Sequence, residues 1–200
     1  MQILELILDE QQMASGIDAI SIVKSPAIES NFIALNNHKV KFATVDAEKR
    51  ILLGPALIPN KPIYRKQDGM EFYCYFSRGT VKKASELYLQ RGNQNQATLE
   101  HAIKLQGMCL IESWVKEDME KDKSAYYGMN DALGTWYVAM KVEDDKVWND
   151  YVKTGLVTGF SIEGYFVDKG KVEMKKEPTQ EERVKAVVDI LTEYAKNVTK

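Results

Sequence analysis

The residue best placed by its surroundings to do chemistry is Ser161. It lies in the segment 157–166, Val-Thr-Gly-Phe-Ser-Ile-Glu-Gly-Tyr-Phe, whose β-branched and aromatic residues are typical of a strand. Gly159 and Gly164 flank the serine and let other atoms approach the backbone closely. A serine hydroxyl is a poor nucleophile until a neighbouring base takes its proton. The segment therefore indicates nucleophilic catalysis only if such a base lies close by.

The choice of base is narrow because the chain contains two histidines. His38 lies among asparagines between two apolar runs, which is typical of an exposed loop residue. His101 is therefore the candidate general base. A serine–lysine pair with Lys104 is an alternative, although nothing in the sequence places that lysine near the serine. So few histidines exclude a histidine-rich metal centre, and we expect no cofactor.

The composition is that of an ordinary soluble domain, with 200 residues, 44% hydrophobic and 28% charged. The 27 basic and 29 acidic side chains nearly cancel, so nucleic acid is not an expected partner. The N-terminus lacks a signal-peptide pattern, and no apolar run approaches the roughly 18 residues of a membrane span. We therefore expect a cytoplasmic protein with no membrane partner. Cys74 and Cys109 lie in apolar runs and are expected to be buried free thiols.

The hydrophobic pattern predicts many short strands with a few helices among them. Helices are expected over 81–90 and 144–154, each ended by a glycine. Strands are expected over 2–8, 19–23, 31–35, 39–44, 51–58, 71–76, 108–115, 136–142 and the serine segment. Because the helices do not alternate regularly with the strands, the pattern favours a mostly antiparallel α+β domain, such as a barrel, over a parallel α/β fold.

The C-terminal segment has the clearest helical pattern. Thr179 and Glu182 form a capping box, and an amphipathic stripe follows it, made of Val184, Val187, Val188, Leu191 and Val198. We therefore divide the chain into a domain over 1–176 and a helix over 177–200 that packs on that domain or on a partner.

Several stretches resemble one family, in that family's order along the chain. They are 16–32, 51–59 with Gly-Pro-Ala, His101, Leu-Ile-Glu-Ser-Trp-Val at 110–115, Gly-Thr-Trp at 134–136, Lys-Val-Glu-Asp-Asp at 141–145 and Gly-Phe-Ser-Ile-Glu-Gly at 159–164. This succession is similar to the serine proteases encoded among the head-assembly genes of tailed bacteriophages.

The resemblance implies a prohead maturation protease similar in fold to the herpesvirus assembly proteases, a β-barrel of about seven strands surrounded by helices. The family places a histidine before a strand-borne serine, and His101 and Ser161 match those positions. Ser161 would attack the scissile carbonyl, and His101 would take its proton and return it to the leaving amine.

Three carboxylates are candidates for the residue that orients the imidazole. Glu112, in the strand that follows His101, is the first, and its alternative role is a surface charge on a strand edge. Glu163 alternates to the same strand face as Ser161 and is a further candidate. Related proteases carry an acid just before a Ser-(Val/Ile)-Val-x-x-Pro-Ala run. Here that run lies near the N-terminus, at 21–27. Ala19 occupies the position of the acidic residue, and Asp18 lies beside it.

The resemblance also implies substrates and a location. We expect an endopeptidase that cleaves the scaffolding protein, the major capsid protein precursor and itself, inside the procapsid in the cytoplasm of the bacterial host. Whether it forms a homodimer is left open. The alternative is a catalytically silent, scaffold-associated structural protein of the phage head with the same fold.

Overall fold

The computed structural model describes residues 2–9, 11–30, 33–34, 49–67 and 69–171. The strand predicted over 39–44, His38 and the C-terminal helix predicted over 177–200 lie outside these residues. Within them we find no helical stretch with the length and hydrophobicity of a bilayer-spanning segment.

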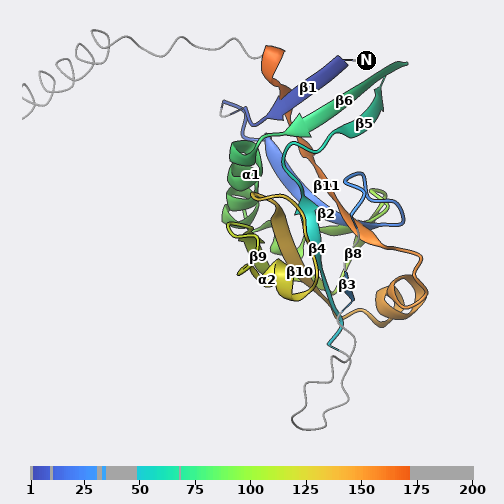
Figure 1. The fold of residues 1–200 in the computed structure, drawn as a ribbon. Coiled ribbons are helices and arrows are strands. Elements are labelled where there is room, and N and C mark those ends of the chain that lie inside the picture. The colour runs from blue at the N-terminus through green and yellow to red at the C-terminus, as the bar shows by residue number, and fades with distance from the viewer. Residues whose placement is uncertain (1, 10, 31–32, 35–48, 68, 172–200) are drawn as a thin grey trace, which may run out of the picture.

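The described strands form three four-stranded sheets (Figure 1). The terminal sheet has the order β12 (Val167–Asp168), β1 (Gln2–Ile7), β6 (Met70–Phe76) and β5 (Ile63–Gln67). The central sheet has the order β3 (Ile33–Ala34), β4 (Ile51–Leu57), β10 (Trp136–Val142) and β9 (Met108–Val115). The serine sheet has the order β11 (Gly159–Tyr165), β2 (Gly16–Val23), β7 (Ala97–Leu99) and β8 (Ile103–Leu105).

Most of the pairings between these strands are antiparallel, as the sequence pattern predicted. Two are parallel, namely β1 with β6 and β2 with β7. Each parallel pair joins strands that are far apart in the chain, so β1 and β2 enter different sheets although they are consecutive in sequence. In Figure 1 the terminal sheet lies at one end of the molecule and the other two sheets form the body.

One hydrophobic core joins the serine sheet, the central sheet and helix α1 (Arg78–Gln90). The helix begins at Ser77, whose hydroxyl accepts a hydrogen bond from the Thr80 N–H, and it buries a face that includes Tyr88. The Tyr88 ring meets the ring of Trp136 edge to face at 5.5 Å. Burial of large aromatic side chains of this kind is a major source of stability.

The predicted barrel of about seven strands surrounded by helices, as in the herpesvirus assembly proteases, is wrong. Each sheet is open, because its two outer strands have no further partner among the described residues. Helix α1 is the one described helix longer than six residues; α2 (Lys123–Tyr126) and the π-helix η2 (Val147–Val152) are short. The described part is thus mostly β, in three packed sheets.

The sequence pattern missed four strands, of which the shortest is the two-residue β12. It predicted a loop where β5 forms, because that strand carries charged residues on an exposed edge and follows a proline. It also missed β7 and β8, which are three residues each. Because His101 lies in the turn of this β7–β8 hairpin, the sequence pattern did not predict the local structure around the histidine.

Candidate active site

Strand β11 places Ser161 and Glu163 on the same face of the serine sheet. In the pairing with β2, Ser161 lies directly opposite Ser21, and Glu163 lies opposite Ala19. Side chains directly opposite each other point to the same side of a sheet, and residues two apart along a strand share a face. The intervening residues, such as Phe160, point to the other face and are part of the core. The four small or polar residues therefore form one patch.

The two glycines beside the serine are required by packing. A Cβ at Gly159 would lie 2.6 Å from Cγ of Pro26, and a Cβ at Gly164 would lie 2.8 Å from Cα of Ile17. Real Cβ atoms essentially never approach other atoms so closely. The close approach predicted for these glycines is thus to the protein's own chain, and they hold β11 tightly against β2.

His101 lies in the tight turn between β7 and β8. The Ala102 N–H donates to the carbonyl of Leu99, and the two central residues, Glu100 and His101, have φ angles of 51° and 57°. Positive φ at both central positions defines a type I′ turn, which usually contains glycine or asparagine. Two larger residues held there cost on the order of 1–3 kcal/mol each, so other contacts must stabilise this turn.

Three hydrogen bonds to β2 and the residue after it provide that stabilisation. Oε1 of Glu100 accepts from the Lys24 N–H at 2.6 Å, and the Glu100 N–H donates to the carbonyl of Ile22 at 3.1 Å. The His101 N–H donates to Oγ of Ser21 at 3.0 Å. The turn is therefore fixed to the strand that lies directly beside β11.

The imidazole of His101 meets the carboxylate of Glu163. Nδ1 of His101 lies 3.2 Å from Oε1 of Glu163, with side chains 43% and 29% exposed. The same carboxylate oxygen accepts a hydrogen bond from the hydroxyl of Thr98 on β7. A carboxylate on Nδ1 holds the proton on that nitrogen and leaves Nε2 free to accept another.

The carboxylate reaches His101 by crossing β2. Glu163 is paired with Ala19 in the register of β11 against β2, and Thr98 is paired with Ser21 in the register of β2 against β7. The side chain of Glu163 therefore passes diagonally over two small residues on β2, one of which is the serine that binds the His101 N–H. A side chain as large as leucine at position 19 would stand in its path.

Ser161 lies beside this assembly, 7% exposed. Ser21 lies on β2 between its register partners, Ser161 on β11 and Thr98 on β7. Its hydroxyl donates a hydrogen bond to the Thr98 carbonyl at 3.3 Å, and the residue is fully buried. Among the described residues, no hydrogen bond joins the Ser161 hydroxyl to His101. Strand β2 lies between the strand of Ser161 and the hairpin of His101, so transfer of the hydroxyl proton requires the imidazole to approach the serine when substrate binds.

The other candidates lie elsewhere. Glu112 is on β9 in the central sheet, where it forms an ion pair with Lys123, and its predicted role stays a prediction. Asp18 is exposed and lies where the register of β2 against β11 shifts, between Ile17 and Ala19. Lys104 is opposite Thr98 on β8, so three strand spacings, about 14 Å, separate it from β11. That distance is too long for a lysine side chain to span.

Two residues that contact the site, Ser21 and Thr98, were not identified from the sequence. A serine or threonine within an apolar strand resembles any tolerated small residue, and its partners are set by pairing between distant strands. The signal that could have found Ser21 is its place in the same run as the family's Ser-(Val/Ile)-Val-x-x-Pro-Ala motif.

A buried serine, a histidine and a carboxylate on one face of a sheet are the groups that serine hydrolases use in nucleophilic catalysis. The chain belongs to the family described as "Putative phage serine protease XkdF", which matches residues 39–168, more than half of the sequence. The matched region includes His101, Ser161 and Glu163, whereas Ser21 precedes it. No curated protein and no solved structure matches the chain.

Proposed function

We propose that this protein is a serine endopeptidase of phage head maturation, with Ser161 as the nucleophile, His101 as the general base and Glu163 as the residue that orients the imidazole. The observation that carries the proposal is the contact of His101 Nδ1 with Glu163 Oε1 at 3.2 Å, on the sheet face that also holds Ser161. Membership of a phage serine protease family supports the same reaction class.

The reaction proceeds by two acyl transfers. Oγ of Ser161 attacks the carbonyl carbon of the scissile peptide while Nε2 of His101 takes the hydroxyl proton. The imidazolium then gives that proton to the leaving amine, and the C–N bond breaks to leave an ester on the serine. Water attacks this ester with its proton going to Nε2, which releases the carboxylic acid and restores the hydroxyl.

Glu163 suits the orienting role better than Glu112 on the described contacts. An orienting carboxylate must meet Nδ1 and stabilise the imidazolium that forms. The carboxylate of Glu163 does meet Nδ1, whereas that of Glu112, on the central sheet, pairs with Lys123 of helix α2. The fixed type I′ turn adds support, because strained backbone is retained mainly where the surrounding structure over-determines it, as it commonly is at active sites.

The proposed substrates and location follow from the kind of protease. We place the enzyme inside the procapsid, in the cytoplasm of the bacterial host, with the scaffolding protein, the major capsid protein precursor and its own chain as substrates. These partners rest on the resemblance to head-maturation proteases and are tested together with the activity.

The test is incubation of the purified protein with scaffolding protein or capsid precursor, followed by mass spectrometry of the fragments. We expect discrete fragments from the native chain and none from Ser161→Ala. Ser15→Ala is the matched control, because Ser15 is also a buried serine but lies outside the patch. If cleavage persists in Ser161→Ala, Ser161 is not the nucleophile.

A silent structural protein of the phage head is the second candidate. The observation that favours it is the burial of Ser161, at 7% exposed, with no described hydrogen bond from its hydroxyl to the histidine. A chain that neither cleaves head proteins nor reacts with an active-site serine reagent, even in assembled heads, would support this candidate over the protease.

A further inference from the structure

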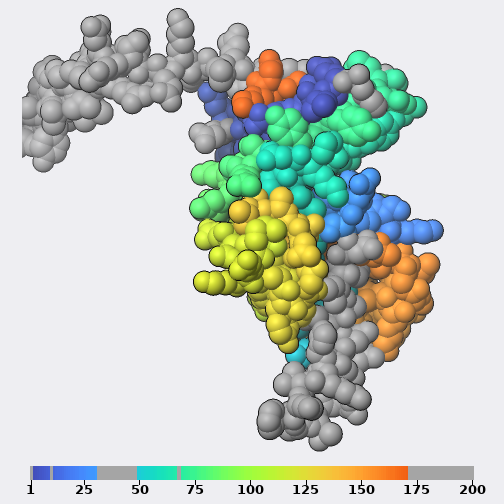
Figure 2. Space-filling model, in the orientation of Figure 1, coloured from blue at the N-terminus to red at the C-terminus, as the bar shows by residue number. Residues whose placement is uncertain are grey.

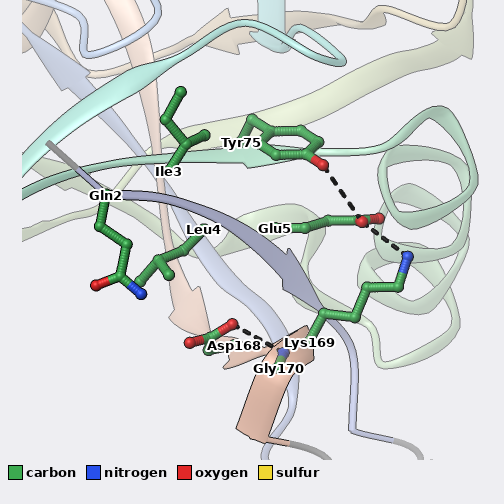
Figure 3. A pocket seen from close by; sticks show the side chains of 8 residues that line it. All are labelled: Gln2, Ile3, Leu4, Glu5, Tyr75, Asp168, Lys169 and Gly170. Atoms are coloured by element: carbon green, nitrogen blue, oxygen red, sulfur yellow. Dashed lines mark hydrogen bonds and ion pairs between the residues drawn. The ribbon is translucent and has the colours of Figure 1, made fainter.

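The terminal sheet has one face on the core and one face without a described covering. Leu6 and Phe72 pack against the core cluster that includes Cys74 and Phe76. Alternate residues of the same strands point the other way and form what we call the tyrosine face: Ile3, Tyr64, Tyr73 and Tyr75. Figure 3 shows Ile3 and Tyr75 on one side of β1 while Leu4 points to the other.

The tyrosine face is aromatic and exposed, with Glu5, Lys66 and Glu71 on the same side of the strands. Ile3 is 62% exposed and Tyr64 is 46% exposed, although both lie on strands in the sheet. The Tyr64 and Tyr73 rings meet edge to face at 5.9 Å, so the aromatic surface is continuous across β5 and β6. Aromatic residues of this kind, with a polar tip and a large apolar body, are enriched where proteins meet other surfaces.

The charges around this face are already paired. Nζ of Lys169 lies 2.8 Å from Glu5, whose carboxylate also accepts from the Tyr75 hydroxyl at 3.4 Å (Figure 3). Lys66 pairs with Glu71 at 3.3 Å. A covering partner therefore meets no unpaired charge here, and the face has no charge bias toward an acidic or a basic partner. The tyrosine face therefore suits the apolar stripe of an amphipathic helix.

Such a stripe occurs in this chain, just beyond the described residues. The sequence predicts an amphipathic helix from Thr179 with Val184, Val187, Val188 and Leu191 on one side. A helix with one apolar stripe and a sheet with one open apolar face are each stabilised by packing against such a partner.

The place where the chain leaves the described part suits this pairing. The last described element, η3 (Lys169–Lys171), contacts β1 at the edge of the sheet. An open pocket of about 660 Å³ lies there, lined by residues of β1, β6 and the end of the described chain, including Ile3, Tyr75 and Lys169 (Figure 3). Figure 2 shows β1 and the end of the described chain adjacent on the surface.

The connection is also long enough. The residues from 172 to 178 can span roughly 23 Å when extended. The four strands of the sheet are only about 14 Å across from first to last. A tethered segment meets its own sheet at an effective concentration in the millimolar range, far above that of a second copy in dilute solution. The chain's own segment is thus the favoured occupant.

From these observations we infer that the C-terminal segment, through its stripe at Val184, Val187, Val188 and Leu191, docks on the tyrosine face of its own chain. The contact is independent of the proposed peptidase activity, since the serine patch lies on another sheet. It assigns the helix predicted over 177–200 to the domain and not to a partner.

Disulfide trapping in the full chain tests this docking. The pair Ile3→Cys with Val188→Cys is made in a background with Cys109→Ser; Cys74 is retained because it is buried. We expect mild oxidation to give a monomer with an internal disulfide, identified by peptide mapping. The matched control replaces Ile3→Cys with Met70→Cys, because Met70 is 67% exposed on the same sheet but alternates to the other face.

Each outcome decides the inference. An internal disulfide with Ile3→Cys and none with Met70→Cys supports the docking. Disulfide-linked dimers alone would show that a second copy occupies the face, and equal trapping in both pairs, or trapping in neither, would overturn the inference. As a second measurement that needs no cysteine, Val188→Glu should speed hydrogen exchange of β1 and β6 several-fold, whereas the polar-side change Glu182→Gln should not.

Discussion

Nδ1 of His101 lies 3.2 Å from Oε1 of Glu163, although β2 separates the β7–β8 hairpin, which carries the histidine, from the strand of the glutamate. The contact exists because a left-handed turn aims the histidine back over the sheet and because small residues on β2 let the glutamate cross it. Histidine and carboxylate are thereby held on the face that carries Ser161.

Removing the charge of Glu163 should impair catalysis and leave the fold in place. We expect Glu163→Gln to lower kcat/KM by roughly 10³- to 10⁴-fold, because an amide no longer stabilises the imidazolium or fixes its tautomer. Peptide hydrolysis kinetics measure the effect. Glu112→Gln is the matched control and should leave the rate within about twofold, as surface substitutions do. The reverse ranking of the two variants would assign the role to Glu112.

Ser21 should act as a positioning residue through the His101 backbone. In Ser21→Ala the His101 N–H loses its acceptor, which we expect to cost about 1–3 kcal/mol of stability. A shift of the imidazole by about 1 Å would lower the rate by up to 10²-fold. Urea unfolding and single-turnover kinetics measure the two effects separately.

Two further variants separate positioning by Ser21 from simple destabilisation. Ser21→Thr keeps the hydroxyl and should recover most of the rate. Ser85→Ala removes another buried hydroxyl, one that donates to the Lys82 carbonyl in α1 at 2.7 Å, and should affect stability without affecting kcat. If Ser85→Ala and Ser21→Ala lower kcat equally, Ser21 has no specific role.

A larger residue at position 19 should block the path of Glu163. We expect Ala19→Leu to reproduce the loss seen in Glu163→Gln, and combining the two changes should add little, because both break the same contact. A double-mutant cycle on kcat/KM measures this. Fully additive losses would mean that Glu163 does not need to cross β2 at this point.

The ion pair of Glu5 with Lys169 should make stability depend on pH at both ends. The hydrogen bond from Lys169 is the chief cause that lowers the pKa of Glu5, and the same bond raises the pKa of Lys169. For Glu5 the stabilisation is present above its ordinary pKa of 4.5 and is lost as the pH falls through the lowered pKa. For Lys169 it is present below 10.5 and is lost as the pH rises through the raised pKa.

Glu5→Gln should therefore remove part of this pH dependence. The pair is partly exposed, so we expect a small difference in the free energy of unfolding at neutral pH, vanishing at the acidic end. Denaturant midpoints of the native and variant chains across the pH range measure it. Parallel curves at all pH values would contradict the assignment.

The sequence predicted those parts of the fold that local patterns control. Strands β4, β6, β9, β10 and β11 and helix α1 match their predicted segments closely because each has a clear apolar period and a local stop signal. The closed barrel was wrong because sheet closure depends on pairing between distant strands, such as β1 with β6, which no local pattern records.

The same limit applies to the candidate site. Residue type was enough to select Ser161 and His101 from the sequence. Alternation along the serine strand was enough to select Glu163. Their proximity could not be predicted, because it depends on the register of β11 against β2 and of β2 against β7. The turn at Glu100 and His101 also gave no signal, since neither residue is typical of a type I′ turn.

The most direct test of the central claim is labelling of the native chain with a fluorophosphonate, with the modified residue located by mass spectrometry. We expect one adduct on Ser161 that disappears in His101→Ala and is strongly reduced in Glu163→Gln, while Glu112→Gln labels normally. Labelling at another serine, or labelling of Ser161 that is unaffected by loss of His101, would contradict it.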